Sequence, residues 1–151
     1  MLFMLMQLGA DRYAIAAREV LEILPLVEFR RLPHTPPEVA GLFVYRGIMV
    51  PALDLCQLAT GEPAQSRLST RIVLVDYRPG KPLGLIAEHV TETLRREPAD
   101  FQRAGVQGPD ARYLGPVTRD ARGIVQRIEL QYLLSEALCA QLYVQTEPPQ
   151  P

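Results

Sequence analysis

The side chains that most often carry acid–base, metal or nucleophilic chemistry are few in this sequence, which has two histidines and two cysteines among 151 residues. His34 lies in a proline-rich loop, and His89 has acidic neighbours but no second histidine to complete a metal site. Cys56 and Cys139 sit in apolar segments without a CxxC spacing. We therefore expect a solvated loop histidine, a surface pairing of the other, and inert core thiols in a reducing compartment.

Motifs for catalysis are absent as well. The chain has no phosphate loop, no GxSxG elbow, no HExxH and no GxGxxG. Its carboxylates are scattered singly, for example at Asp54, Asp76 and Asp120. The sequence gives no particular support to a hydrolase whose two carboxylates are brought together only by the fold, although it does not exclude one. The sequence thus predicts no catalytic residue, no metal site and no cofactor.

The charge balance weighs against a polyanionic ligand. Sixteen basic and 17 acidic residues give a formal net charge of −1. A small β-barrel module that binds nucleic acid is the main alternative from another functional class, and it would require a basic stripe with interleaved aromatic residues. The best candidate stripe is Arg95, Arg96, Phe101 and Arg103, which is short and has acidic residues beside it.

One charged residue is unusual for a plain core segment. Arg46 and Gly47 interrupt the apolar stretch LFVYRGIMVP. An arginine in this position must either extend to the surface or find a partner, because burying it unpaired is costly. The alternative is a binding anchor ringed by apolar side chains, as at the hot spots of protein interfaces.

The elements that must position these residues are mostly strands. Alternation, β-branched content and turn residues predict a mainly β chain. The strands are expected at 1–8, 13–17, 48–55, 71–77, 83–87, 114–118 and 124–128. Residues 16–24 fit a helix and a strand equally well. Pro51 confines its strand to an edge or a bulge.

Three helical segments are also expected. Pro36 to Gly41 reads as a single helical turn, and Asp54 is placed to cap a short helix over 55–60 that Gly61 ends. Residues 129–143 carry leucines with a period of 3.6, which predicts a C-terminal amphipathic helix. We expect one domain over residues 1–146 and a disordered, proline-rich tail over 147–151.

Two segments of the chain resemble each other. YAIAAREVLEIL (13–24) and LGLIAEHVTETL (83–94) superpose without gaps, with four identities in 12 positions, and Glu22 coincides with Glu92. Each copy follows an apolar strand and a short turn. Such a match arises either by chance between two β-hairpins or from a duplication, and a duplication would make the chain two similar small barrels packed face to face.

The order of these segments resembles the CheW-like chemotaxis coupling proteins from Met1 to about Tyr143. The most specific match is P-x-x-V-x-G-x-x-x-x-R-G-x-x-x-P-x-x-D-L, from Pro36 or Pro37 to Leu55, together with the two V-x-E segments. The resemblance implies two SH3-like, five-stranded β-barrel subdomains around a shared hydrophobic core, interleaved in one domain, with short helices and the C-terminal amphipathic helix.

The resemblance also implies a function. Such a protein is a non-enzymatic adaptor that bridges the cytoplasmic tip of methyl-accepting chemoreceptors to the regulatory domain of a CheA-type histidine kinase. The family's receptor-binding positions correspond here to Arg46 and Gly47, and to Val20, Glu22 and Ile23. An apolar groove would take the receptor's helical hairpin, and Arg46 would fix its register. The residues that face the kinase are unknown.

The sequence departs from the family at Val44 and Tyr45, where Asn-Leu is usual before Arg-Gly, and at Arg71, where an apolar residue is commoner. It also has no extension ahead of the first strand. These departures raise the alternative of a coupling paralogue that serves a second chemosensory pathway. The apolar start, Met1 to Met6, is far shorter than the roughly 20 residues that span a bilayer. We expect a cytoplasmic protein that does not insert in the membrane and is recruited to receptor arrays.

Overall fold

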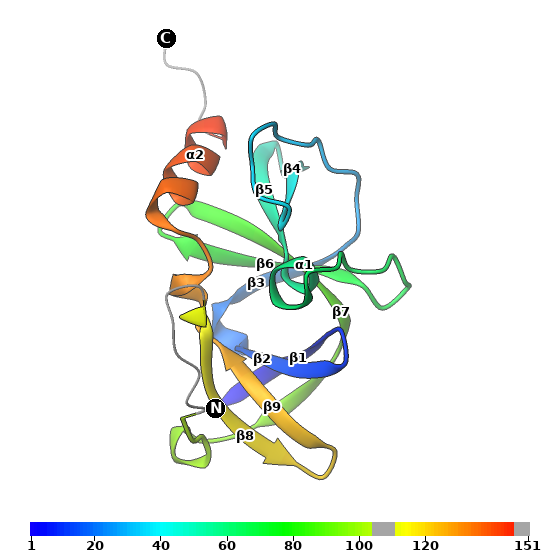
Figure 1. Ribbon diagram of the computed structural model, residues 1–151, viewed down its shortest axis with the longest axis vertical. Helices are drawn as coiled ribbons and strands as arrows, with labels where there is room; N and C mark the ends of the chain where they lie inside the picture. Colours follow the sequence, from blue (N-terminus) through cyan, green and yellow to red (C-terminus); the bar gives the residue numbers. More distant parts are fainter. Residues whose placement is uncertain (104–110, 147–151) are drawn as a thin grey trace.

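The computed structural model describes residues 1–103 and 111–146, and the tail predicted over 147–151 lies outside the described residues (Figure 1). The predicted mainly β class is confirmed. The strands are β1 (Leu2–Leu8), β2 (Asp11–Ala16), β3 (Val20–Pro25), β4 (Val39–Tyr45), β5 (Ile48–Asp54), β6 (Arg71–Arg78), β7 (Lys81–Arg95), β8 (Leu114–Asp120) and β9 (Gly123–Ile128). The helices are α1 (Leu55–Thr60) and α2 (Glu136–Thr146).

The strands pair in two groups that share β7. One group has the order β3-β6-β7-β5-β4, and the other has the order β7-β1-β2-β9-β8. Two pairs, β5 with β7 and β2 with β9, are parallel, and the rest are antiparallel. β7 is 15 residues long, and it leaves the first group and enters the second near His89, whose φ is 49°.

Two isolated bridges add to these ladders. Arg30, beyond the end of β3, exchanges two 2.8 Å backbone hydrogen bonds with Leu42 on β4. Gln102, beyond the end of β7, pairs in the same way with Val117 on β8, at 2.8 and 2.7 Å. In the first group, therefore, the segment after β3 contacts β4. In the second group, the segment after β7 contacts β8.

The hydrophobic core follows from this pairing. Its largest cluster takes buried side chains from both groups and from α2, among them Met6, Ile15, Val73, Leu85 and Leu142. Two smaller clusters belong to one group each. They are Phe43, Val50, Ala52, Ile72, Leu74 and Ile86 in the first, and Phe3, Leu5, Ala14, Ala16 and Val125 in the second.

Helix α1 forms as predicted. Asp54 caps its N-terminus, because one carboxylate oxygen accepts a 3.1 Å hydrogen bond from the backbone N–H of Gln57. Gly61 ends it with a left-handed φ of 81°. Pro51 lies on β5 opposite Leu42 of β4, one residue before β5 begins to pair with β7 on its other side. Its missing N–H therefore removes no bond to β7. The predicted edge position is nevertheless wrong, because β5 lies between β4 and β7.

The helical turn predicted from Pro36 to Gly41 is wrong. A single 3.0 Å hydrogen bond from Val39 N–H to the Pro36 carbonyl closes a turn, and β4 begins at Val39. Pairing with β5 supplies the backbone hydrogen bonds that a helix would otherwise have supplied. The ambiguous segment 16–24 resolves into a short 3-10 turn over Ala17–Glu19 and then β3.

The C-terminal helix begins later than predicted. The expected helix over 129–143 is replaced by a 3-10 turn at Leu130–Tyr132, followed by α2. The Ser135 hydroxyl accepts a 3.1 Å hydrogen bond from the backbone N–H of Leu138, which caps the helix at that point. Local capping by a hydroxyl therefore outweighs the leucine period in fixing the start of this helix.

The predicted one-sided burial of the C-terminal segment is largely correct. Leu130, Leu133, Leu134 and Leu142 are buried as expected, whereas Ala137 is exposed. The buried face of α2 is made by residues spaced three and four apart, as helical geometry requires. These residues are Cys139, Leu142 and Tyr143.

An ion pair ties β2 to the turn between β8 and β9. The Arg12 guanidinium donates two hydrogen bonds to the Asp120 carboxylate, one of them at 3.0 Å, and both side chains are less than a fifth exposed. These hydrogen bonds lower the pKa of Asp120 from 3.8 to about 2. A depressed folded-state pKa stabilises the fold above pH 4, and this contribution is lost as the pH falls toward 2.

Asp120→Asn is accordingly expected to lower the free energy of unfolding at pH 7 by about 1 to 2 kcal/mol. Near pH 2 the wild-type carboxyl is about half protonated and most of its contribution is lost, so the difference between the two proteins should be much smaller than at pH 7. Urea denaturation at pH 7, 4 and 2 measures the difference. A deficit of the same size at all three pH values would show that the ionised carboxylate is not the stabilising group.

Candidate protein-binding surface

Arg46 stands at the tip of the β4–β5 hairpin. Arg46 and Gly47 have φ values of 48° and 79°, the left-handed pair that a two-residue type I′ turn requires. The Arg46 guanidinium lies 3.3 Å from Oε1 of Glu22 on β3, and 5.2 Å from the centre of the Tyr45 ring. Its side chain is 74% exposed. Arg46 therefore extends to the surface and is not consumed by an internal ion pair.

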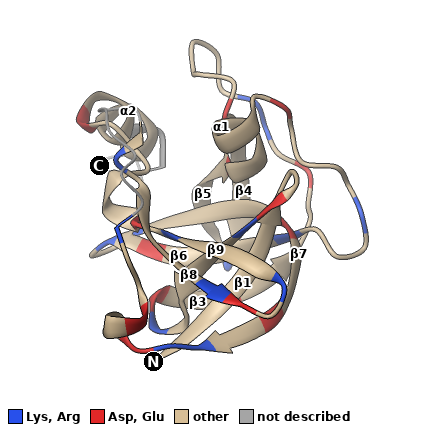
Figure 2. Ribbon diagram, turned by 60° about the horizontal axis from the view of Figure 1, so that its bottom comes forward, with Lys and Arg blue, Asp and Glu red and all other residues tan. Residues whose placement is uncertain are grey.

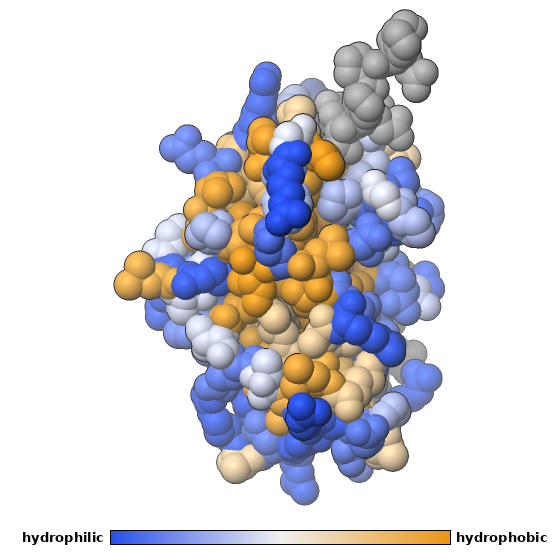
Figure 3. All heavy atoms as spheres, turned by 180° about the vertical axis from the view of Figure 1, so that it is seen from behind, coloured by the Kyte–Doolittle hydropathy of each residue, from blue (hydrophilic) through white to orange (hydrophobic). Residues whose placement is uncertain are grey.

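Large apolar side chains are exposed on β3 and on the hairpin, the two elements that carry Glu22 and Arg46. Burial alternates along β3, so that Leu21 and Ile23 point outward, 58% and 39% exposed. On the hairpin, Val44 is 70% exposed, and Ile48 and Met49 are also exposed. Figure 3, seen from behind, shows apolar side chains gathered over one face of the molecule. We call the following set the β3–hairpin surface: Leu21, Glu22, Ile23, Val44, Arg46, Ile48 and Met49.

The structure brings together most of the residues that the sequence predicted for this surface. Arg46 contacts Glu22 directly, Gly47 lies in the same turn, and Ile23 is exposed beside Glu22 on β3. Val20 differs from them, because its half-buried side chain packs against the largest core cluster. Its main contacts are therefore internal.

Four members of the surface were not predicted. They are Leu21, Val44, Ile48 and Met49. The alternation of β3 would have placed Leu21 on the same face as Ile23, once residues 16–24 were known to end in a strand. The exposure of the hairpin residues had no local signal, because Val44, Ile48 and Met49 belong to the apolar segments on either side of Arg46 and Gly47, which look like core strands.

The second half of the chain repeats the arginine–glutamate contact in another form. Arg122, in the turn between β8 and β9, donates hydrogen bonds of 2.8 and 3.1 Å to the carboxylate of Glu92. Glu92 is the residue that coincides with Glu22 in the repeated segments. Unlike Arg46, Arg122 also donates its backbone N–H to Asp120 at 2.9 Å, and Asp120 is held by Arg12. The second tip is therefore fixed by a charged network, whereas the Arg46 tip has apolar neighbours.

Both cysteines are buried, and one of the two histidines contacts a hydroxyl. Burial raises the pKa of the Cys56 thiol to about 12, so this cysteine is protonated at neutral pH. Cys139 is also buried, and His89 lies 3.4 Å from the Ser69 hydroxyl. Within residues 1–103 and 111–146, no group of three or more histidine, cysteine, aspartate or glutamate side chains could hold a metal ion.

The proposed basic stripe does not form a platform for nucleic acid. The Arg96 guanidinium donates to the backbone carbonyls of Arg95 and Arg119, at 2.7 and 3.1 Å. Phe101 packs its ring against Phe3, with the centres 5.1 Å apart, so it is not free to stack on a base. Figure 2 shows acidic and basic residues interspersed along the ribbon. This region lacks the geometry that the nucleic-acid alternative requires.

The described part of the chain has no helix long and apolar enough to cross a bilayer.

Comparison with known proteins places the chain in a family. A profile of the CheW-like domain matches residues 2–138. The chain is 30% identical over 94 residues to the chemotaxis protein CheW of Helicobacter pylori, a match that covers 62% of this chain and 56% of that protein. It thus spans little more than half the length of this curated relative.

The fold agrees with a solved structure. The crystal structure of the scaffolding protein TtCheW from Thermoanaerobacter tengcongensis superposes with a TM-score of 0.78 at 20% identity, over 89% of this chain and 87% of that one. At this level of identity the likeness establishes the fold alone. The profile match covers nearly all of the described residues, and the chain belongs to the CheW-like domain family.

Proposed function

We propose that this protein is a non-enzymatic scaffold that couples methyl-accepting chemoreceptors to a CheA-type histidine kinase in bacterial chemosensory signalling. Membership of the CheW-like family supports the class of function. The observation that carries the proposal is the exposed Arg46–Glu22 pair, on two elements that also expose large apolar side chains, in a molecule with two joined strand groups. Such a surface is built to contact another protein.

We infer that each strand group is a small, five-stranded barrel of the SH3-like kind. The bridge between Arg30 and Leu42 supports closure of the group that contains β3 and β4. The bridge between Gln102 and Val117 supports closure of the other group. β7 contributes one half to each barrel, so the two are interleaved in one domain spanning residues 1–146. A scaffold with two similar halves offers two separate faces to its partners.

The receptor occupies the β3–hairpin surface in this proposal. The cytoplasmic tip of a chemoreceptor is a helical hairpin, and its apolar stripe would cover Leu21, Ile23 and Val44. Burying exposed apolar area supplies most of the affinity. The Arg46 guanidinium would donate to a carboxylate or to carbonyl groups on the receptor helix and so fix its register. Gly47 allows the turn that presents Arg46.

The kinase occupies a different face. The regulatory domain of a CheA-type kinase is itself CheW-like, so the contact joins two molecules of the same fold. Exposed strand and turn residues at a barrel end would provide it. The scaffold would then work in the cytoplasm, recruited to membrane-associated receptor arrays through its two partners.

The role of Arg46 is tested by a pair of matched variants. Arg46→Ala is expected to weaken binding of a receptor helical-hairpin fragment about 10-fold, because a charge-assisted contact is lost. Its free energy of unfolding should change by less than about 0.5 kcal/mol, since the Arg46–Glu22 pair is solvent-exposed. Isothermal titration calorimetry and urea denaturation give the two quantities.

Arg122→Ala is the control, because it removes the corresponding arginine of the second half. It should leave receptor affinity within about twofold of wild type, as expected for a change away from the interface. Equal losses in the two variants would mean that Arg46 acts through general charge and not as an anchor.

A further inference from the structure

The loop between α1 and β6 presents one leucine to solvent. Leu68 is 93% exposed, more than any other large apolar side chain of the described residues. The loop beneath it is tied to the fold by two mostly buried carboxylates. Asp54 accepts a 3.0 Å hydrogen bond from Ala64 N–H, and Glu88 accepts one of the same length from Gln65 N–H. Leu68 is thus held out on an anchored loop, which lowers the entropic cost of using it as a contact.

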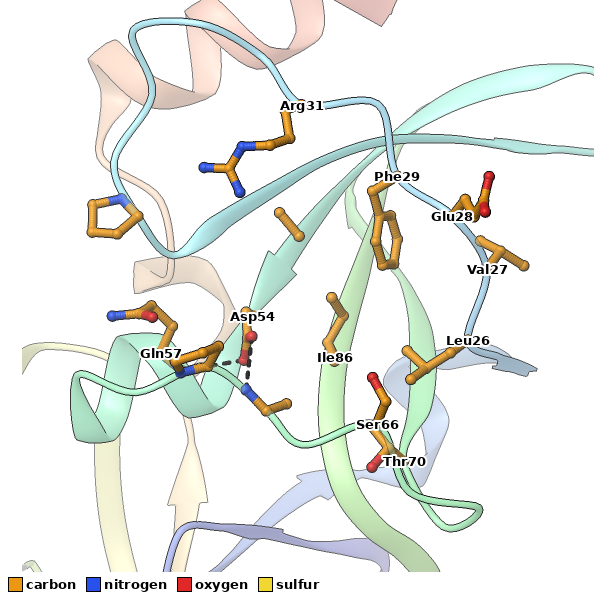
Figure 4. Close-up of a pocket in the computed structure, with 14 residues that line it drawn as sticks. Leu26, Val27, Glu28, Phe29, Arg31, Asp54, Gln57, Ser66, Thr70 and Ile86 are labelled. Carbon is orange, nitrogen blue, oxygen red and sulfur yellow. Dashed lines mark hydrogen bonds between the residues drawn. The ribbon is translucent and has the colours of Figure 1, made fainter.

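An open cleft of about 860 Å³ adjoins the same loop. The loop forms one wall, through Pro63, Ala64 and Ser66, and the segment 26–31 after β3 forms the opposite wall. Figure 4 shows Phe29 and Leu26 on this second wall with Ile86 beside them. These three side chains give the cleft an apolar part of a size that accepts a leucine, whereas Asp54, Gln57 and Thr70 make the rest of its lining polar.

Charged residues lie on both segments that border the cleft. The loop that carries Leu68 also carries Glu62 and Arg67, whose guanidinium donates to the Gln65 side chain, and the opposite wall carries Glu28 and Arg31. All four residues are exposed, and within the described chain none of them forms an ion pair. Each wall therefore offers one acid and one base to an incoming surface.

We propose that this face is a homodimer interface, in which Leu68 of each copy enters the cleft of the other. A projecting side chain and a cavity that fits it, on the same face of one molecule, are self-complementary under a twofold axis. The same axis sets the loop wall of one copy against the opposite wall of the other, so that Glu62 and Arg67 meet Arg31 and Glu28. A second copy fits these features better than an unrelated peptide, which would use the cleft and leave Leu68 bare.

Sedimentation equilibrium of the full chain tests the proposal. Between about 10 µM and 1 mM the wild-type weight-average mass should rise from that of a monomer toward that of a dimer. Leu68→Asp should weaken the dimer at least about 100-fold, because two leucines lose their burial at once. Its thermal unfolding should match wild type, since Leu68 has almost no packing in the monomer.

Ile124→Asp is the matched control, because Ile124 is 65% exposed on β9, away from the cleft lining. It should dimerise like wild type. A wild-type chain that stays monomeric at 1 mM overturns the proposal, and so does a dimer that Leu68→Asp leaves intact. Leu68 is not part of the β3–hairpin surface, so receptor binding by Leu68→Asp is expected to be unchanged whichever result is obtained.

Discussion

Substituting aspartate for both Leu21 and Val44 is expected to weaken binding of a receptor helical hairpin by at least about 1000-fold. Leu21 and Val44 are the two most exposed apolar side chains of the β3–hairpin surface, at 58% and 70%. Each loses roughly 1.5 to 3 kcal/mol of apolar burial in the complex, and each new carboxylate must be desolvated beneath the helix. Calorimetric titration with the hairpin fragment measures the loss.

Stability should change little in this double variant, because both side chains already face water in the free protein. Ile124→Asp serves as the control for an exposed apolar side chain outside the surface, and it should bind the receptor hairpin as wild type does. If the Leu21→Asp, Val44→Asp variant binds the receptor hairpin with full affinity, the receptor does not bind this face of the molecule.

Gly41→Ala is expected to cost at least about 3 kcal/mol of folding stability. A Cβ atom at this position would stand 2.2 Å from the carbonyl oxygen of Arg30 and 2.7 Å from its carbonyl carbon. The obstacle is backbone, so no rotamer change relieves it. The chain must shift at the two hydrogen bonds between Arg30 and Leu42, which join the segment after β3 to β4. The φ of Gly41, 137°, adds strain for any residue with a side chain.

Gly47→Ala provides the comparison for Gly41→Ala. Gly47 also has a positive φ, 79°, but an added Cβ meets nothing within 4 Å. Only the left-handed backbone penalty of about 1 kcal/mol remains. Urea denaturation of the two variants separates steric exclusion from conformational strain. If Gly41→Ala costs no more than Gly47→Ala, close approach of the Arg30 backbone is not what requires glycine at position 41.

Much of this architecture could be predicted from local sequence. Helix α1 was fixed by Asp54 at one end and Gly61 at the other, because caps act over a few residues. Alternation and turn residues, which are local signals, also predicted β1, β2, β5, β6, β8 and β9. They did not predict β4, which precedes the turn at Arg46 and Gly47, or the second half of β7. The likeness of residues 13–24 and 83–94 also has a structural counterpart. The first halves of both segments enter a parallel pairing, β2 with β9 and β7 with β5.

The wrong predictions concern segments whose structure depends on contacts with residues distant in the sequence. Residues 36–41 begin with two prolines, which favour the start of a helix. Residues 39–41 nevertheless belong to β4, because they pair with β5. Residues 129–135 keep the leucine period but pack as a 3-10 turn before the Ser135 cap. The binding surface was incomplete for the same reason. Exposure of Val44 depends on how the β4–β5 hairpin packs against the rest of the fold, which composition does not encode.

The most direct test of the scaffold claim is a three-component binding experiment. The chain, a receptor helical-hairpin fragment and a kinase regulatory domain are mixed in equal amounts and separated by size-exclusion chromatography with light scattering. We predict one complex that contains all three components, and we predict that the Leu21→Asp, Val44→Asp variant keeps the kinase domain and loses the receptor. If the kinase domain instead displaces the receptor from the wild-type chain, the two partners share one face and the protein does not bridge them.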